Sequence, residues 1–248
     1  MERKNFLRSF ALAAASGPML LVACKKESAS TTTDSNGTTT SADTTANSSA
    51  CRVSPTEVEG PYPYPGGEIK NPLDRVDITG GQTGVPLTLN LLVVNTNDNC
   101  NVVTNARVDI WHCNKDGYYS GYSGQSGVLG TKSYVGETWL RGYQTSDGTG
   151  AVAFNTIYPG WYGGRATHIH FEIYVNSVLK KTTQLTFSET ISDAVHKSSL
   201  YTGTVNTTRN ANDGIFGNSA TDLANETLSM AGSIAAGYVG NYTFGIAL

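Results

Sequence analysis

Two histidines set two residues apart are the first feature of this sequence with metal-binding chemistry. In residues 167–175 (THIHFEIYV), polar side chains alternate with apolar ones. Side chains alternate across a β-strand, so His168 and His170 share one face of the predicted strand. Glu172 and Tyr174 continue that face, and the apolar residues form the other. Two imidazoles at i and i+2 lie close enough to bind one metal ion; two surface histidines on a half-exposed strand are the simpler alternative.

Tyrosines gather in two turn-rich segments of the same sequence. Residues 156–166 (TIYPGWYGGRA) place Tyr162 on a Pro/Gly turn just before the histidine strand, and residues 111–122 contain Tyr118 and Tyr119. The sequence has 13 tyrosines in all, so a packing or rim position is the simpler alternative for each of them.

Short strands divided by turns must position these residues. Alternating or continuously apolar patterns predict further strands at 87–94, 106–113 and 151–157, and Asn-, Asp- and Gly-rich turns separate them. No amphipathic helix pattern lies between them. The pattern predicts an all-β fold, an antiparallel β-sandwich with long loops and little helix. The tail 188–248 is poorly patterned, although 222–235 has the pattern of a short helix.

Charge and cysteine content limit the partners and the compartment. The formal net charge is −3 and no basic patch is visible, so the sequence indicates no nucleic-acid partner. Three cysteines follow Cys24 in the sequence. Cys100 and Cys113 flank a predicted strand boundary, and in an oxidising compartment we expect these two to pair, leaving Cys51 unpaired.

The N-terminus has the pattern of an export signal. A net-positive start is followed by an apolar segment that ends in Leu-Val-Ala-Cys24, which resembles the lipobox of bacterial lipoproteins. A lipid chain on Cys24 would anchor the protein without spanning the membrane. Residues 25–50 are Ser/Thr-rich and are expected to form a disordered tether. We therefore predict an export signal with lipobox at 1–24, a tether at 25–50, and a folded domain at 51–248 on a membrane facing the periplasm or exterior.

Six short stretches together carry a family resemblance. They are EVEGPY (57–62), VDIW (108–111), GYYS (117–120), LRGYQ (140–144), TIYPGWY (156–162) and RATHIHF (165–171). In this order, over roughly residues 55 to 187, they resemble the intradiol ring-cleavage dioxygenases, which include protocatechuate 3,4-dioxygenase and catechol 1,2-dioxygenase.

The resemblance implies a non-haem Fe(III) centre. Its ligands would be Tyr119, Tyr162, His168 and His170. Fe(III) is a hard cation that prefers anionic oxygen donors and also accepts imidazole, and a bound cation favours the ionised form of tyrosine. Two phenolates and one hydroxide would balance the +3 charge and lower the cost of burying the site. Tyr118 is the close competitor of Tyr119 for the first position. Arg165 matches an arginine that stabilises negative charge on the bound substrate, and Gln184 matches a glutamine just outside the ligands. The segment 59–62 matches one that lines the pocket, whereas Tyr62 could equally be structural. His112 and His196 have no matching ligand role.

The resemblance also implies the reaction. A small aromatic diol of the catechol type would bind the iron and react with O2, and the ring would open between the two hydroxyl-bearing carbons to give a muconate-type diacid. Tyr162 would leave the metal as the diol enters and take one of its protons. Two departures from the family stand out: only five residues separate Tyr162 from His168, and a tether replaces the helical dimerisation segment of the catechol 1,2-dioxygenases.

Two other functions fit parts of the sequence. A non-catalytic surface β-sandwich could recognise sugar or peptide through its tyrosines. A zinc hydrolase could use the histidine pair, but that reading gives the tyrosines no role. Neither the particular catechol nor the oligomeric state follows from the sequence.

Overall fold

The computed structural model describes residues 51–67 and 73–248. The chain divides into two units, Met1–Thr44 and Thr45–Leu248, and every described residue belongs to the second. The predicted export signal, Cys24 and the tether at 25–50 lie outside the described residues, so their assignments stay predictions. Within the described ranges, no helix has the length and apolar character needed to cross a bilayer.

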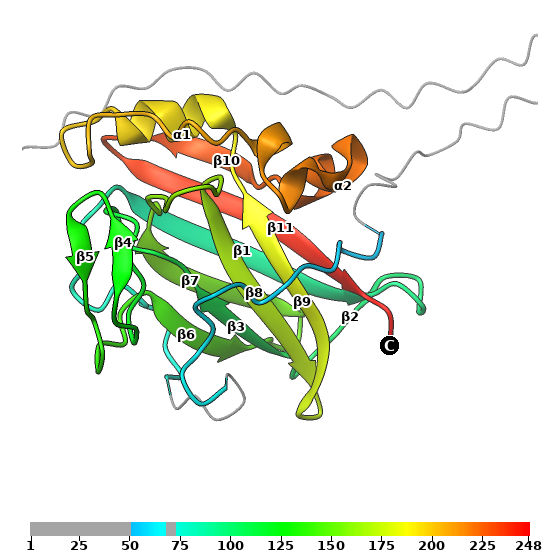
Figure 1. The fold of residues 1–248 in the computed structure, drawn as a ribbon. Coiled ribbons are helices and arrows are strands. Elements are labelled where there is room, and N and C mark those ends of the chain that lie inside the picture. The colour runs from blue at the N-terminus through cyan, green and yellow to red at the C-terminus, as the bar shows by residue number, and fades with distance from the viewer. Residues whose placement is uncertain (1–50, 68–72) are drawn as a thin grey trace, which may run out of the picture. The chain divides into compact units, whose positions relative to one another are not determined.

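Two β-sheets form the folded unit (Figure 1). The first has the order β10-β11-β1-β2, with β7 also paired to β1, and the second has the order β6-β3-β8-β9. A separate hairpin pairs β4 with β5. The strands are β1 (Pro86–Asn95), β2 (Asn101–Val102), β3 (Arg107–Trp111), β4 (Gln125–Gly127), β5 (Gly130–Lys132), β6 (Arg141–Thr145), β7 (Ala151–Ile157), β8 (His168–Val175), β9 (Val178–Thr186), β10 (Ser229–Ser233) and β11 (Gly237–Ile246).

The core lies between the two sheets because each strand turns one apolar face inward. In β1 the buried positions alternate along Leu87, Leu89, Leu91 and Val93. In β8 the apolar face predicted from the sequence joins the same core, and the ring of Phe171 lies 5.1 Å from that of Phe244 on β11. Each fully buried side chain of this size contributes about 1.5–3 kcal/mol to folding. The predicted sandwich is therefore confirmed, and the histidine face of β8 points away from this core.

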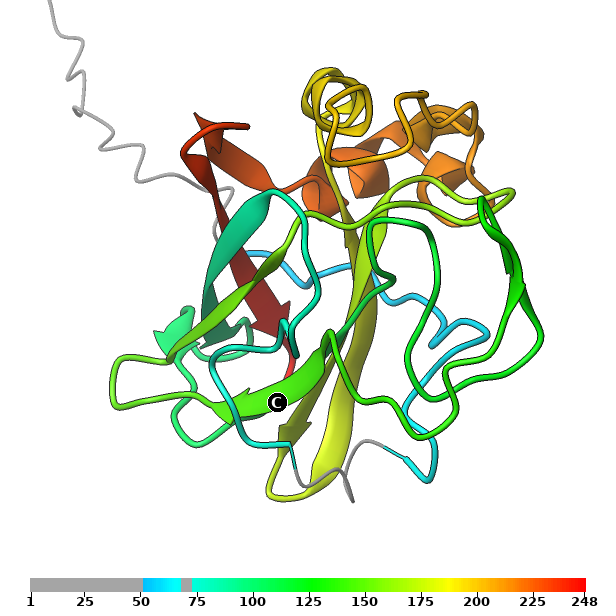
Figure 2. The same cartoon turned by 90° about the vertical axis from the view of Figure 1, so that its left-hand side faces the viewer.

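One strand pair departs from the antiparallel pattern. β11 runs parallel to β1, in register from Leu87 opposite Tyr238 to Asn95 opposite Ile246. The remaining pairs between named strands in the described part of the chain are antiparallel. β11 thus brings the last strand of the chain beside the first, which Figure 2 shows as adjacent red and teal strands.

The tail after β9 is more ordered than its sequence pattern suggests. It contains the helices α1 (Glu189–His196) and α2 (Ala220–Glu226), two 3-10 turns, η2 (Asn210–Asn212) and η3 (Phe216–Asn218), and the strands β10 and β11. The predicted helix at 222–235 is wrong in its second half. The Ser219 side chain caps α2 by accepting from Asp222 N at 2.9 Å, but the helix ends at Glu226. Residues 229–233 are strand because β11 supplies hydrogen-bond partners that a local pattern does not show.

The predicted disulfide is also wrong. Cys51 pairs with Cys100, and Cys113 is a free, buried thiol. A disulfide needs the two Cα atoms within about 7 Å. Cys100 lies in the turn between β1 and β2, whereas β3 carries the chain roughly 13 Å onward before Cys113 is reached. Burial raises the pKa of the Cys113 thiol to about 12, which keeps it protonated.

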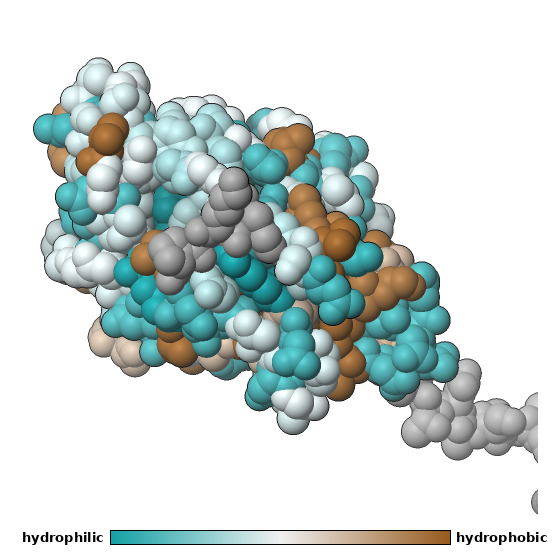
Figure 3. Space-filling view, turned by 90° about the horizontal axis from the view of Figure 1, so that it is seen from below, coloured by the Kyte–Doolittle hydropathy of each residue, from teal (hydrophilic) through white to brown (hydrophobic). Residues whose placement is uncertain are grey.

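The outer surface is largely hydrophilic on the face seen from below (Figure 3). Hydrophobic residues gather toward one side of that view. At the turn between β8 and β9, Val178 and Leu179 are exposed.

Candidate active site

β8 buries both histidines on the face that looks away from the sandwich core. His168 and His170 are each only 1% exposed, so the alternative of two surface histidines does not hold. The neighbouring strand β3 places Trp111 opposite His170 in the register. The two rings stack with centroids 5.1 Å apart and planes 4° from parallel. Trp111 therefore covers one side of His170 and fixes its ring plane.

The loop between β3 and β4 turns Tyr119 onto the two histidines. Gln125 holds this loop, because Tyr119 N donates to Gln125 Oε1 and Gln125 Nε2 donates to Tyr119 O, both at 2.7 Å. The phenol oxygen of Tyr119 lies 3.1 Å from His170 Nε2 and 3.4 Å from His168 Nε2. The two Nε2 atoms are 3.0 Å apart. Three donor atoms from two distant segments thus converge on one point.

Tyr118, the competing candidate, points elsewhere. Its hydroxyl donates to Gly130 O at 2.6 Å and accepts from Leu129 N at 2.9 Å. Its ring packs so closely on Gly127 that a Cβ there would lie 2.6 Å from the ring. Tyr118 therefore anchors the β4–β5 hairpin, and of the two adjacent tyrosines only Tyr119 reaches the histidines.

Burial keeps these groups neutral. The Nδ1–H of His168 donates to Ala166 O at 2.6 Å, which leaves the lone pair of Nε2 facing Tyr119. Burial, and next the Arg165 charge, lower the pKa of His168 to about 3. Burial, and next His168, hold the pKa of His170 well below its ordinary value. Burial also raises the pKa of Tyr119 well above its usual 10. Without a metal, these groups are two neutral imidazoles and a neutral phenol at pH 7.

Tyr162 reaches the cluster from the loop between β7 and β8. Its ring centroid lies 5.7 Å from that of Tyr119 and 5.5 Å from that of His168. Its hydroxyl accepts a hydrogen bond from Arg165 Nη1 at 3.3 Å. Burial raises the pKa of Tyr162 to about 12, against the opposing effect of Arg165. Tyr162 is half-buried, so it forms the rim of the cluster where Tyr119 forms the floor.

Arg165 and Gln184 form a second layer beside Tyr162. The Nη2 of Arg165 donates to Gln184 Oε1 at 2.6 Å, and Gln184 Nε2 donates to Val58 O at 2.8 Å. Gln184 lies opposite His170 in the β8–β9 register. The structure thus brings together all six predicted site residues: Tyr119, Tyr162, Arg165, His168, His170 and Gln184.

The segment at 57–62 closes the other side of the cluster. Tyr62 stacks on Tyr119 with ring centroids 4.8 Å apart. Gly60 lies against His170, and a Cβ at this position would be 2.9 Å from His170 Cε1. The family resemblance predicts that residues 59–62 line the pocket, but it assigns no separate role to Gly60. Only glycine, which has no Cβ, allows the backbone to approach the imidazole this closely.

Asp213 is the site residue that sequence reasoning missed. It lies in the poorly patterned tail, between η2 and η3, and its side chain is fully buried. Its Oδ2 accepts from Arg165 Nε at 2.9 Å and from Ala166 N at 2.6 Å. A single aspartate among many polar tail residues carries no spacing signal, so only the fold could have revealed it.

The other two histidines take no part in the cluster. His112 is fully buried, donates through Nδ1 to Cys113 O at 2.8 Å, and accepts through Nε2 from Thr156 Oγ1 at 2.7 Å. His196 donates through Nε2 to Pro159 O at 3.1 Å and packs on Trp161. Burial lowers the pKa of each to about 4. The hydrogen bonds of these two histidines stabilise the fold and are not part of the cluster.

The donor set fits a single metal ion. Two ligand atoms that each lie about 2.0–2.1 Å from one ion at right angles are roughly 3 Å apart, and the two Nε2 atoms are 3.0 Å apart. Both imidazoles are neutral, as metal binding requires. No group of three or more His, Cys, Asp and Glu that could hold a metal occurs in the described ranges. The third atom that converges with the two imidazole nitrogens is the Tyr119 phenol oxygen. Phenolate oxygen with imidazole nitrogen suits a hard cation such as Fe(III).

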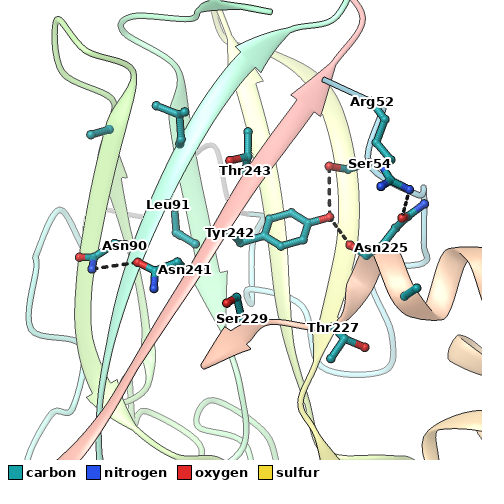
Figure 4. A pocket seen from close by; sticks show the side chains of 13 residues that line it. Arg52, Ser54, Asn90, Leu91, Asn225, Thr227, Ser229, Asn241, Tyr242 and Thr243 are labelled. Carbon is teal, nitrogen blue, oxygen red and sulfur yellow. Dashed lines mark hydrogen bonds between the residues drawn. The ribbon is translucent and has the colours of Figure 1, made fainter. Parts of the chain in front are cut away.

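A groove of about 520 Å³ lies elsewhere, on the outer face of the first sheet (Figure 4). Amide and hydroxyl side chains line much of it, including Asn90, Asn241 and Thr243, and Asn90 Nδ2 donates to Asn241 Oδ1 at 3.3 Å. The groove shares no residue with the Tyr/His cluster.

Comparisons of the sequence with known proteins indicate dioxygenases. A family model described as Dioxygenase matches residues 58–228. Catechol 1,2-dioxygenase 1 of Acinetobacter lwoffii is 27% identical over 149 residues, which are 53% of this chain and 45% of that protein. The chain therefore spans less than half the length of this curated relative.

Solved structures share the fold. An intradiol ring-cleavage dioxygenase from Tetranychus urticae superposes with a TM-score of 0.69 at 27% identity, covering 79% of this chain and 95% of that one. The dioxygenase domain of a dioxygenase carbohydrate-binding protein fusion from Streptomyces sp. SirexAA-E, at 24% identity and a TM-score of 0.56, covers 79% of this chain and 99% of that one and shows the same fold. Because the family model covers well over half of the sequence, this chain belongs to the intradiol ring-cleavage dioxygenases.

Proposed function

We propose that this protein is a non-haem Fe(III) intradiol dioxygenase. It cleaves a catechol-type ring between the two hydroxyl-bearing carbons with O2 and yields a muconate-type diacid. The observation that carries this proposal is the convergence of Tyr119 Oη with the Nε2 atoms of His168 and His170 within 3.4 Å, beside Tyr162 and Arg165. The iron, when bound, supplies the Lewis acid that binds the diol and makes it reactive toward O2.

Four side chains would hold the ion in this proposal, three as fixed ligands and one as a ligand that also accepts a proton. His168, His170 and Tyr119 are buried and tightly packed, so they stay in place. Tyr162 is half-buried, its hydroxyl lies 3.3 Å from Arg165 Nη1, and it would be the group that accepts a proton from the diol at its Oη. The charge of Arg165 stabilises negative charge that develops nearby, as a fixed cation in a water-poor site does.

Aromatic rings surround the cluster and exclude water. Tyr62, Trp111 and Tyr119 contact one another or His170 on the closed sides. Tyr62, Tyr162 and Arg165 are half-buried, and a small flat diol therefore enters between them. A zinc hydrolase would leave these tyrosines without a role.

We further propose that the protein is exported and anchored by lipid at Cys24. The charged and apolar pattern of residues 2–23 supports export. The disulfide between Cys51 and Cys100 supports it independently, because such bonds persist in oxidising compartments. Labelling of the expressed protein with a radioactive fatty acid tests the anchor, and a Cys24→Ala variant that still carries label would contradict it.

An anaerobic titration tests the enzymatic proposal. Protein loaded with one Fe(III) per chain should be coloured, because tyrosinate-to-Fe(III) charge transfer absorbs visible light. Catechol added without O2 should shift that band, and admission of O2 should give a diacid whose mass is that of catechol plus two oxygen atoms. Iron-loaded protein that is colourless, or that gives no such product with any of several catechols, would overturn the proposal.

Two adjacent tyrosines supply a matched control. Tyr119→Phe should remove most of the visible band and reduce turnover by at least about 100-fold, since it deletes a metal ligand. Tyr118→Phe removes an equally buried hydroxyl that is bound only to the β4–β5 hairpin. It should keep the colour and the turnover. Equal losses in both variants would show that Tyr119 acts through packing rather than through the metal.

A further inference from the structure

Asp213 accepts four hydrogen bonds, and two of them join the C-terminal segment to residues beside the cluster. One carboxylate oxygen accepts from Arg165 Nε and Ala166 N. The other accepts from Ile215 N at 2.8 Å and Phe216 N at 3.2 Å. The side chain is 0% exposed, so these four donors replace its water shell. Nothing in this network touches the three converging donor atoms directly.

The first effect of this network is on the direction of Arg165. A guanidinium is a rigid planar fork, so fixing one nitrogen fixes the directions of the others. Asp213 engages Nε, and the two terminal nitrogens then face Gln184 Oε1 at 2.6 Å and the Tyr162 hydroxyl at 3.3 Å. Gln184 is held in turn by Val58 O. Asp213 and Gln184 therefore hold the guanidinium of Arg165 at two of its nitrogens, and the third, Nη1, donates to the Tyr162 hydroxyl.

The second effect is on the backbone that precedes the histidine strand. The Asp213 oxygen that binds Arg165 also binds Ala166 N, and Ala166 O accepts the Nδ1–H of His168 at 2.6 Å. One carboxylate thus fixes the arginine and the peptide that orients the first histidine. Asn206 adds to this by donating through Nδ2 to Arg165 O at 2.8 Å.

The charge of Asp213 matters as well as its position. Arg165 is mostly buried, with a side chain that is 14% exposed, and lies beside two tyrosines that become anionic when a ferric ion binds. A buried cation without a fixed counter-charge is drawn toward water. Asp213 supplies that counter-charge at the Nε end, so Nη1 stays directed at the Tyr162 hydroxyl.

We propose that Asp213 is a positioning residue that acts through Arg165. It directs the guanidinium to Tyr162 and Gln184 and so controls how strongly Tyr162 is held at the metal. The inference rests on the proposed iron site, but it concerns a residue of the C-terminal segment that touches neither metal nor substrate.

Asp213→Asn is the decisive variant, because it keeps the size, removes the negative charge beside Arg165, and leaves one acceptor oxygen where the carboxylate has two. We expect kcat for catechol to fall about 10- to 100-fold, as other supporting residues around metal sites do, while KM changes less than about 3-fold. The iron content should stay near one per chain. The charge-transfer band should move to longer wavelength, since a phenolate that loses a hydrogen bond gives up its electron more easily. An unchanged kcat or an unmoved band would overturn the proposal.

A double-mutant cycle separates action through Arg165 from a general loss of structure. If Asp213 acts through Arg165, adding Asp213→Asn to Arg165→Gln should change kcat by less than about 3-fold. Losses that multiply in the double variant would contradict that route. If Asp213→Asn does not fold, Asp213→Glu carries the same measurements. It keeps the charge at a shifted position, so we expect a smaller fall in kcat and a smaller band shift in the same direction, and a normal band and kcat would again overturn the proposal.

Asp109→Asn is the matched control. Asp109 is also 0% exposed and pairs with Arg107 at 2.8 Å, and in the sheet register these two residues lie opposite Glu172 and Tyr174 rather than opposite the histidines. The variant should lower the urea midpoint and leave kcat and the band unchanged. An equal fall in kcat in this control would mean that any lost ion pair has the same effect, which would overturn the specific role of Asp213. Failure of the proposed function is distinguishable, because it would show as absent turnover in the unmutated protein, whereas the band shift does not depend on turnover.

Discussion

The two halves of β8 have the same alternation of polar and apolar residues, but their polar side chains contact different groups. His168 and His170 in the first half face Tyr119, Tyr162 and Trp111, which other loops and strands bring to them. In the second half, the Tyr174 hydroxyl donates to Glu172 Oε2, and Thr182 Oγ1 donates to Glu172 Oε1 at 3.2 Å. These polar groups satisfy each other within the sheet.

The difference shows what a strand pattern can and cannot specify. Alternation puts four polar side chains on one face of β8, but it makes no metal site by itself. The site arises only where the loops after β3 and β7 add tyrosines above the strand. In the second half, Glu172 is hydrogen-bonded to Tyr174 and Thr182, which belong to the sheet itself.

The largest expected effect tests this contrast directly. His170→Ala should lower iron affinity by more than about 100-fold and abolish the visible band, because it deletes a ligand rather than a supporting group. Tyr174→Phe, on the same face, should keep one iron per chain and full turnover while lowering the unfolding free energy by about 1 kcal/mol. Iron content and urea unfolding measure the two outcomes. Loss of iron in Tyr174→Phe would show that the second half of β8 also takes part in metal binding.

A pH profile of the iron-free protein gives the next largest effect. All four histidines of the chain have lowered pKa values in the fold. Groups buried as neutral histidine contribute stability that is present above about pH 6.5 and is lost as the pH falls, by up to about 1.4 kcal/mol per pH unit each. The unfolding free energy in urea should therefore decline steeply from pH 6.5 to 5. A flat profile would show that the histidines are not buried without metal.

Glu226 adds the opposite slope on the alkaline side. Its side chain is fully buried, and burial, with Glu57 next in importance, raises its pKa to about 8. Its contribution is present below about pH 4.5 and is lost as the pH rises toward 8, again by up to about 1.4 kcal/mol per unit. Stability of the iron-free protein should thus peak near pH 7. Glu226→Gln should remove the decline above pH 7, and a variant that still declines there would assign that slope to another group.

The smallest expected effect concerns the packing beside the first half of β8. Gly60 has a φ of +80° and Gly66 a φ of +88°, but a Cβ at Gly60 would meet His170 whereas a Cβ at Gly66 would meet nothing within 4 Å. Gly66→Ala should cost about 1 kcal/mol of unfolding free energy from backbone strain alone. Gly60→Ala should cost more and also weaken iron binding. Equal effects on iron in both variants would show that the contact with His170 is unimportant.

Local pattern was sufficient to predict much of this fold and most of its site. The strands at 87–94, 151–157 and 167–175 were predictable because each turns an apolar face to the core at every second residue. Five of the six candidate site residues lie in the family-like stretches, and Gln184 was matched to the family beyond them. The geometry then distinguishes Tyr119, which reaches the histidines, from Tyr118, which does not.

The missed features depend on contacts between distant segments. β11 contains Gly237, Gly240 and Gly245, which weaken its strand pattern, yet a Cβ at Gly245 would lie 1.8 Å from Arg52 O, so close packing requires the glycine. The Cys51–Cys100 pairing depends on where the start of the described chain crosses the β1–β2 turn. Asp213 can be identified as part of the site only from the fold, which places its segment beside Arg165.

The Cys51–Cys100 bond has a mechanical consequence. The chain from Cys51 onward is fastened at successive points before it reaches the cluster: by the disulfide, by Ser54 N donating to Gly245 O at 2.9 Å, and by Glu57 N donating to Thr182 O at 2.9 Å. A force applied through the residues that precede Cys51 is therefore borne by the rigid sheets. The segment with Gly60 and Tyr62 is shielded from tension, so a pull on the leading segment leaves its contacts with His170 and Tyr119 unchanged.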